Sequence, residues 1–198
     1  MGKHGTEYER IERDFYPTPP WVIAALAEHV DLRGLTVWEP ACGDGRMVEA
    51  LRQQGCARVY ASDIVDYGAG QVFDFLSGLL PPKLERPPDA IITNPPFGHH
   101  HSRLAVAFIE AGLTHIRQHG GILALLLPVD FDSATKRPRY FRDCPEFVGK
   151  IVLTERVVWF ENPDPKKESP KENTAWFLWE RSPLRTRRPP NPVCASER

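Results

Sequence analysis

The sequence contains few cysteines and no long run of apolar residues. Its four cysteines are scattered without a close pair, whereas zinc sites and disulfide scaffolds need cysteines at characteristic spacings. The longest apolar stretch, GILALLLPV at 121–129, is too short to cross a bilayer. Residues 1–14 are polar and charged and lack the apolar segment of a secretory signal. These absences predict a cytoplasmic protein without a disulfide framework and without a membrane span.

An excess of charge of one sign is also missing, because 25 Lys and Arg residues face 26 Asp and Glu residues. The chain as a whole therefore has no electrostatic preference for a polyanion. Two local basic clusters remain, KRPRYFR at 136–142 and the Arg-rich stretch at 185–188. Each is either a phosphate-binding surface or a solvated loop or tail. Three consecutive histidines at 99–101 lack chelating spacing, so they indicate an exposed loop or a helix start and no metal is expected.

Hydrophobic periodicity predicts an α/β protein in which helices and strands alternate. Thr18 is a candidate N-cap of the first helix, with Pro19 at the first helical position. The stretch at 122–128 is apolar throughout, which is typical of a central parallel strand covered on both faces. No helix separates the last two strands, which predicts a terminal antiparallel hairpin. The predicted elements are helices at 18–30, 45–55 and 103–120, strands at 35–40, 57–63, 89–94, 122–128, 150–160 and 174–181, and a short strand or turn at 71–76.

The length of 198 residues suits one full-sized core. We expect a polar N-terminal extension at 1–14, one domain at 15–182 and a tail rich in Pro and Arg at 183–198. The stretch at 161–173 contains three prolines and many charges. It therefore predicts a mobile loop between the last two strands.

The segment TNPPFG at 93–98 directly follows an apolar strand and raises the first functional hypothesis. Its prolines remove backbone donors and fix the direction of the Pro95 carbonyl. Asn94 adds an amide that can accept hydrogen bonds, and Phe97 adds a flat apolar face. Two acceptors beside an aromatic ring suit an amino group on a planar molecule. The alternative is a Pro-rich turn that closes a buried strand, and this segment alone supports both readings.

A second candidate site follows the predicted strand at 35–40, where VWEPACGDG leads from Glu39 through small residues into a helix. Small residues let a ligand approach the backbone, and free N–H groups at a helix start favour an anionic group. Asp63 ends the next strand, about 18 residues after Gly45, close to the offset of ~20 at which an acid meets ribose hydroxyls. Val48 stands where a dinucleotide-binding G-x-G-x-x-G would have its third glycine. The pattern predicts a nucleotide-type site.

Taken in order, these motifs resemble those of S-adenosylmethionine-dependent amino-methyltransferases that act on DNA. Any one motif is weakly specific, but five in this order on the expected elements are specific together. Their order is similar to the gamma arrangement of adenine-N6 methyltransferases, and the DFDSATKR loop resembles that of compact phage and mobile-element enzymes. The motifs are FYPTPP at 15–20, EPACGDG at 39–45, SD at 62–63, DF at 74–75 and NPPF at 94–97.

The resemblance implies a Rossmann-like class I methyltransferase fold, with a mostly parallel seven-stranded sheet, a terminal antiparallel hairpin and helices on both faces. It also implies S-adenosyl-L-methionine as cofactor. The methionine part would lie against Ala41 and Gly43, with Glu39 near its ammonium group. Asp63 would bind the ribose hydroxyls. The implied cofactor-binding residues are Tyr16, Thr18, Glu39, Ala41, Gly43, Asp63, Ile64, Asp74, Phe75 and Asn94.

Several of these residues also have a purely structural interpretation. Thr18 could serve only as a helix cap, and Asp74 could be a turn residue rather than an acceptor for the adenine amine. For Ile64, expected to pack on the adenine, and Phe75, expected to flank it, the core interpretation is slightly favoured.

The implied catalytic residues are Asn94, Pro95, Pro96 and Phe97. The Asn94 side-chain oxygen and the Pro95 carbonyl would each accept one N–H of the target amine, while Phe97 would stack on the base. The family often has Tyr in place of Phe97, and stacking needs only the ring.

The expected partner is nucleic acid, with DNA favoured over RNA and adenine N6 as the acceptor. Lys136, Arg137 and Arg139 are the candidate phosphate-binding residues. An RNA base or a protein glutamine amide presents a similar planar NH2 group, so both stay open as substrates. A methyltransferase-like module that binds without catalysis is the competing class. Target recognition would come from the loops at 130–147 and 161–173 or from a separate specificity partner.

Overall fold

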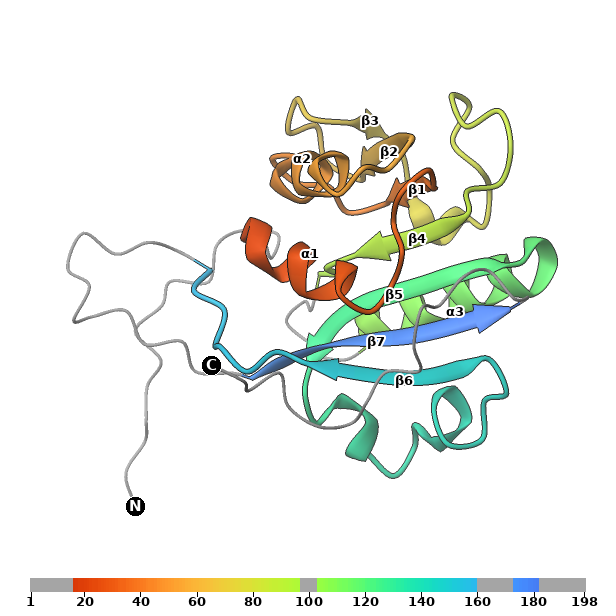
Figure 1. Ribbon diagram of the computed structural model, residues 1–198. Coiled ribbons are helices and arrows are strands. Elements are labelled where there is room, and N and C mark those ends of the chain that lie inside the picture. The colour runs from red at the N-terminus through yellow and green to blue at the C-terminus, as the bar shows by residue number, and fades with distance from the viewer. Residues whose placement is uncertain (1–15, 97–102, 160–172, 182–198) are drawn as a thin grey trace, which may run out of the picture.

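The computed structural model describes residues 16–96, 103–159 and 173–181. Its centre is a seven-stranded sheet with the order β3-β2-β1-β4-β5-β7-β6 (Figure 1). The pairs among the first five strands of that order are parallel, whereas β7 runs antiparallel to both β5 and β6. The mostly parallel sheet and the terminal antiparallel hairpin are thus confirmed. The strands are β1 (Thr36–Glu39), β2 (Arg58–Asp63), β3 (Gln71–Val72), β4 (Ala90–Thr93), β5 (Gly121–Pro128), β6 (Phe147–Val152) and β7 (Thr174–Arg181).

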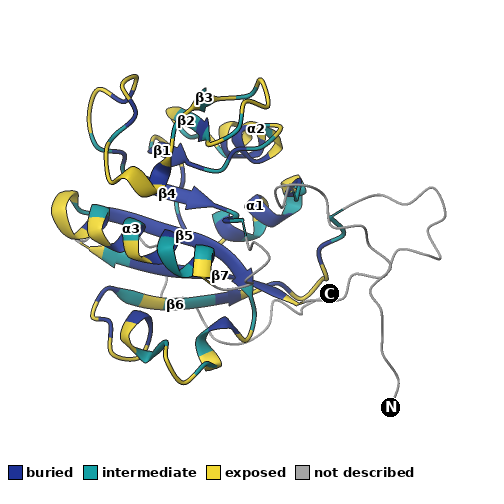
Figure 2. Cartoon of the chain, turned by 180° about the vertical axis from the view of Figure 1, so that it is seen from behind, coloured by how far each residue is buried: buried dark blue, intermediate teal, exposed yellow. Residues whose placement is uncertain are grey.

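Helices cover both faces of this sheet. Figure 1 shows α1 in front of the central strands, and the reverse view in Figure 2 shows α3 across the other face, with its exposed residues turned outward. Apolar residues of α3 recur at helical spacing, so one side of the helix is buried against the sheet. The helices are α1 (Pro20–Ala27), α2 (Arg46–Gln53) and α3 (Arg103–His119), and the 3-10 turns are η1 (Phe75–Ser77), η2 (Phe131–Ser133) and η3 (Pro138–Tyr140).

The sheet separates two apolar clusters, because alternate residues of a strand point to opposite faces. Along β7, Trp176 packs in the cluster beneath α1 and α2, whereas Phe177 and Trp179 pack in the cluster beneath α3. The two buried indoles of β7 each find a backbone acceptor. Trp176 Nε1 donates to the Val22 carbonyl of α1, and Trp179 Nε1 donates to the Tyr140 carbonyl of η3. These two bonds attach a flanking segment to each face of β7, the last strand of the chain's described part.

The structure corrects two boundaries that the sequence predicts. The first helix begins at Pro20 with Pro19 as its N-cap, and no side chain caps it. Thr18 is therefore not an N-cap; it is buried and its hydroxyl bonds elsewhere. The strand predicted at 150–160 is displaced toward the N-terminus as β6, because its register against β7 starts at Phe147.

None of the described helices is both long enough and apolar enough to cross a membrane. The predicted loop at 161–173 lies outside the described residues except for Asn173, as do the extension at 1–14, the histidines at 99–101 and the tail at 183–198.

Candidate cofactor and acceptor site

The carboxyl ends of three adjacent parallel strands bring the predicted polar residues together. β1 lies between β2 and β4, so the chain crosses from one side of β1 to the other. Ligands of open α/β sheets bind at such a switch point, outside the carboxyl ends of the strands. Glu39 ends β1, Asp63 ends β2, and Thr93 ends β4 immediately before Asn94.

The glycine-containing loop after β1 has a backbone conformation that is unfavourable for residues with a side chain. Gly43 and Gly45 adopt φ values of 51° and 85°, in the left-handed region where glycine carries no steric penalty. Gly45 is the N-cap of α2. The Gly43 N–H donates to Asp63 Oδ2 at 3.0 Å, which fixes the loop against the end of β2. The glycine-containing loop and Asp63, which the sequence predicts to form one site, are thus joined by a hydrogen bond.

Asp63 organises the loops on both of its sides. Its Oδ2 accepts from Gly43 and its Oδ1 accepts from the backbone N–H of Val65, each at 3.0 Å. A carboxylate has about four lone-pair sites, so both oxygens retain capacity to accept from hydroxyl groups. Next to it, Ile64 is 68% exposed. An exposed apolar side chain beside an acid is the arrangement expected for binding a nucleoside. The exposure of Ile64 also rules out its interpretation as a core residue.

Glu39 is the most deeply buried acid of the site, with 1% of its surface exposed. Its Oε1 accepts from the Ala41 N–H at 3.0 Å and from the Thr93 hydroxyl at 2.5 Å. Its Oε2 is buried without a hydrogen-bond partner among the described residues. Burial raises the pKa of Glu39 to about 8, against the opposing effects of the two donors. An unpaired, buried carboxylate oxygen fits a cationic ligand group such as an ammonium.

Asn94 is oriented by the segment that precedes α1. Its Nδ2 donates to the Tyr16 carbonyl at 3.4 Å and to the Thr18 hydroxyl at 3.2 Å. A carbonyl can only accept, so the NH2 group must face Tyr16 and the amide oxygen must face the other way. That oxygen, Oδ1, is buried and has no partner among the described residues. Asn94 thus presents an acceptor that no described residue uses, and its role toward a target amine stays a prediction.

The remaining predicted site residues occupy different surroundings. Pro95 is buried and Pro96 is half-buried, whereas Phe97 lies outside the described residues. The Asp74 Oδ1 accepts from the Leu76 N–H and caps η1, while its side chain stays exposed. Phe75 is buried, with ring centroids of Trp38 and Phe108 each 5.0 Å away. Phe75 thus serves the core, whatever it contributes to a ligand.

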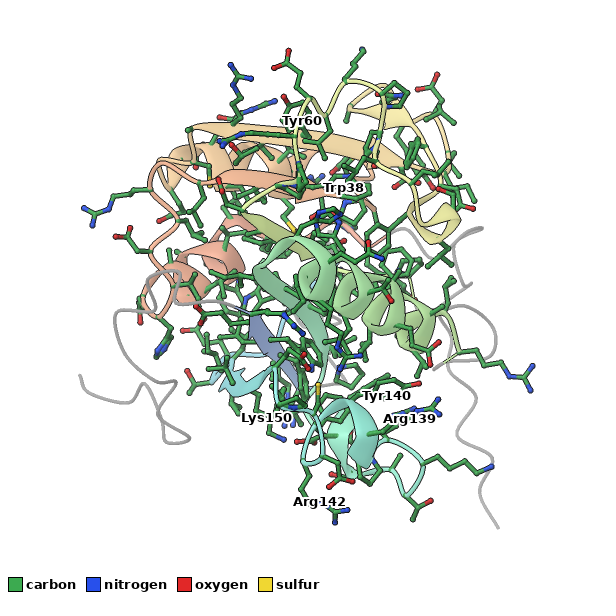
Figure 3. All side chains as sticks on the ribbon, turned by 90° about the vertical axis from the view of Figure 1, so that its right-hand side faces the viewer. Trp38, Tyr60, Arg139, Tyr140, Arg142 and Lys150 are labelled. Atoms are coloured by element: carbon green, nitrogen blue, oxygen red, sulfur yellow. The ribbon has the colours of Figure 1, made fainter. Side chains whose placement is uncertain are left out.

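The predicted basic residues belong to the segment after β5, and Figure 3 shows Arg139 of this segment below α3. The Arg137 guanidinium lies over the Phe131 ring at 3.7 Å and donates to the Phe131 carbonyl. Arg139 pairs with Glu110 of α3 at 3.3 Å. Lys136 is exposed. Two of the three predicted cations therefore also have contacts within the protein.

Two residues of the site are not singled out by the sequence. Thr93 is fully buried and links β4 to Glu39. Trp159 packs edge-on against Tyr16, with ring centroids 5.7 Å apart, and so supports the segment that orients Asn94. The position of Thr93 directly before Asn94 is the only signal that could have indicated its role.

The fold is found in solved structures that include a methyltransferase. The methyltransferase subunit of a type I restriction-modification system from Streptococcus thermophilus superposes with a TM-score of 0.58 at 15% identity, over 84% of this chain and 45% of that one. TrmN from Thermus thermophilus superposes with a TM-score of 0.51 at 20% identity, over 81% of this chain and 48% of that one. The chain therefore has the Rossmann-like fold of class I methyltransferases.

No known protein-family model matches the chain. Its sequence is similar to that of the rRNA N(6)-adenosine-methyltransferase Mettl5 of Drosophila melanogaster, with 29% identity over 57% of this chain. The match spans 63% of the length of that relative. The chain is thus similar in sequence to part of one curated methyltransferase, and the solved structures show that it shares their fold.

The buried Glu39 gives a stability effect that can be measured without any ligand. Because its folded-state pKa of about 8 exceeds its ordinary value of 4.5, the native state holds an extra proton between these pH values. This contribution to stability is present at low pH and is lost as the pH rises toward 8. Glu39→Gln stays neutral throughout. We therefore expect the variant to gain stability relative to the wild type as the pH is raised from 5 to 9.

Urea unfolding at several pH values would measure this difference. Glu28→Gln, which removes a carboxylate from the exposed end of α1, controls for the lost formal charge. A constant difference between Glu39→Gln and the wild type across this pH range would show that Glu39 is ionised in the folded protein.

Proposed function

We propose that this protein is an S-adenosylmethionine-dependent methyltransferase that acts on the exocyclic N6 amine of adenine in nucleic acid. The observation that carries the proposal is the Asn94 amide, whose oxygen is buried and has no hydrogen-bond partner in the described part of the chain, while its NH2 group is engaged by Tyr16 and Thr18. A buried acceptor without a partner costs free energy unless a ligand supplies the donor. Asn94 is thus preorganised to accept an N–H group.

The residues of the neighbouring site fit the cofactor. The unpaired Oε2 of Glu39 would hold the ammonium group, and the carboxylate of Asp63 would accept from the ribose hydroxyls. The exposed Ile64 offers an apolar surface for the adenine ring. When bound, S-adenosylmethionine supplies an electrophilic methyl group on a sulfonium centre.

The protein would activate the target amine through hydrogen bonding alone. The lone pair of an exocyclic amine is delocalised into the purine ring, which makes the nitrogen a poor nucleophile. Two oxygens, Asn94 Oδ1 and the Pro95 carbonyl, would each accept a hydrogen bond from one N–H of the amine. These two hydrogen bonds would favour a pyramidal nitrogen whose lone pair is available for attack. The same oxygens would stabilise the positive charge that grows on nitrogen during transfer, a preorganised electrostatic effect. Phe97 would stack on the base, which must leave a duplex to reach the site.

Adenine is the favoured acceptor because two lines of evidence meet on it. The motif order is similar to that of adenine-N6 enzymes of DNA, and the curated relative is by its name an adenosine methyltransferase of rRNA. The motif order indicates DNA and the relative's name indicates RNA. The proposal is therefore the same reaction, methylation of adenine N6, on either polymer. A protein glutamine amide and a non-catalytic binding module are the competing outcomes.

One experiment tests the proposal directly. The purified chain is incubated with S-adenosylmethionine labelled in its methyl group and with separate DNA, RNA and protein pools, followed by nucleoside analysis. We expect label in N6-methyladenine or its ribonucleoside. Label only in protein would overturn the substrate class, and cofactor binding without transfer to any pool would favour the binding module.

The basic cluster yields a prediction about nucleic-acid binding. Replacing Lys136 and Arg139 together by Glu should weaken binding and reduce the slope of log affinity against log salt by about 2, if both contact phosphate in a duplex. The matched control replaces two exposed cations elsewhere, Lys83 and Arg52, by Glu. If the two double variants had equal slopes of log affinity against log salt, the basic cluster would not contact the nucleic acid.

A further inference from the structure

The end of β4 carries a buried contact that joins the two halves of the site. Thr93 has no exposed surface, and its hydroxyl donates to Glu39 Oε1 at the end of the adjacent strand β1. The two strands pair in parallel, with Val37 opposite Ala90. Thr93 is followed directly by Asn94, so one strand end bears both the acceptor for the target amine and the donor to Glu39.

This hydrogen bond leaves a defined part of the Glu39 carboxyl group free. Oε1 accepts from both Thr93 and Ala41, whereas Oε2 has no partner among the described residues. The donors on Oε1 therefore fix which oxygen faces the ligand. Among the described residues, the other titratable groups that act on Glu39 or are acted on by it are the Asp63 carboxylate at the end of β2 and the Cys42 thiol in the loop after β1. Neither is a cation, so donors rather than positive charges stabilise an ionised Glu39.

We propose that Thr93 is a positioning residue, which orients Glu39 and favours its ionised form so that the carboxylate can receive the ammonium group of the cofactor. The inference rests on the proposed function only in the identity of the ligand. A hydroxyl donor stabilises a buried carboxylate, and the Thr93 bond accordingly lowers the pKa of Glu39 against the stronger effect of burial. Without this donor Glu39 would remain protonated to a higher pH.

Thr93→Val tests the role, because valine keeps the branched shape and loses the hydroxyl. Calorimetry with S-adenosylmethionine at pH 7 should show affinity about ten- to a hundredfold lower, the range expected for one charge-assisted hydrogen bond. The pH at which binding reaches its maximum should move upward. Thr93→Ser restores the donor and should return both the affinity and the pH profile close to the wild type.

A double-mutant cycle separates this role from simple packing. In the Glu39→Gln background the partner carboxyl group is gone, so Thr93→Val should no longer shift the pH profile and should weaken binding little further. If Thr93→Val weakened binding equally in both backgrounds, or if Thr93→Ser failed to restore the profile, Thr93 would be a packing residue and the inference would be wrong.

A ligand-free measurement keeps the inference independent of the proposed activity. Raising the pKa of Glu39 extends the range in which the native state holds an extra proton. The stability of Thr93→Val should therefore keep falling to a higher pH than that of Thr93→Ser in urea unfolding. If the valine variant did not fold, Thr93→Ala would take its place. Coincident pH profiles would overturn the inference. Absence of cofactor binding by the wild type would instead overturn the proposed function and leave this result standing.

Discussion

Asn94→Ala is expected to lower the rate of methyl transfer by several orders of magnitude while the affinity for S-adenosylmethionine changes little. The amide oxygen is buried, has no hydrogen-bond partner among residues 16–96, 103–159 and 173–181, and is aimed away from Tyr16 and Thr18, which accept from the NH2 group. Its interaction with the amine would strengthen as positive charge develops, so its loss falls mainly on the transition state. Alanine also removes the two anchoring donors, which should cost about 1–3 kcal/mol of stability.

Thr18→Val is the matched control for this anchoring effect. It removes one acceptor of the Asn94 amide and leaves the catalytic oxygen in place, so its rate of transfer should fall far less. Single-turnover methylation and thermal unfolding of both variants separate the contributions. Near-normal turnover by a well-folded Asn94→Ala protein would contradict the proposed mechanism, and a purely structural role for the NPPF segment would then be the better explanation.

Asp63→Ala is expected to weaken cofactor binding by about a hundredfold or more. A carboxylate that accepts from two ribose hydroxyls makes charge-assisted hydrogen bonds, each worth roughly 1.5–3 kcal/mol. The substitution also frees the backbone N–H groups of Gly43 and Val65, which Asp63 holds at 3.0 Å. The loop would lose its attachment to β2, and the site would no longer be preorganised.

Asp44→Ala provides the control, because Asp44 lies in the same loop but is exposed and pairs with Arg46. Calorimetry should show affinity close to the wild type for this variant. Unchanged affinity in a folded Asp63→Ala protein would place the ribose, and with it the cofactor, elsewhere on the sheet.

The sequence anticipates the elements because their signals are local. The apolar run at 122–128 marks the buried central strand β5, and the glycines at 120 and 121 mark the end of α3, where both adopt positive φ. Local signals do not predict the start of α1 correctly. Thr18 has the chemistry of an N-cap, but its hydroxyl is used by Asn94, a residue 76 positions away. A distant partner outweighs the local preference for capping.

The basic cluster shows the same limit. KRPRYFR contains four positive charges and no acid, yet Arg139 pairs with Glu110 of α3, and Arg142 pairs with Asp143 just beyond the segment. The contact with Glu110 arises because the segment after β5 packs below α3. The positive charge that Arg139 presents at the surface therefore depends on Glu110, a neighbour 29 positions away.

The amino-acid sequence by itself determined which chemical groups stand at the strand ends: an acid as the last residue of β1, an acid as the last residue of β2, and an amide followed by two prolines directly after β4. Hydrophobic periodicity and glycine placement depend on neighbouring residues, so they can be read along the chain. Only the tertiary structure decided how these groups are poised. Within the part of the chain that the structure describes, burial leaves one Glu39 oxygen without a partner, Thr93 donates to the other, and Tyr16 turns the Asn94 amide so that its oxygen stays unpaired. Each of these states depends on a hydrogen bond or on burial between residues more than 50 positions apart, which exists only once the strands have packed side by side.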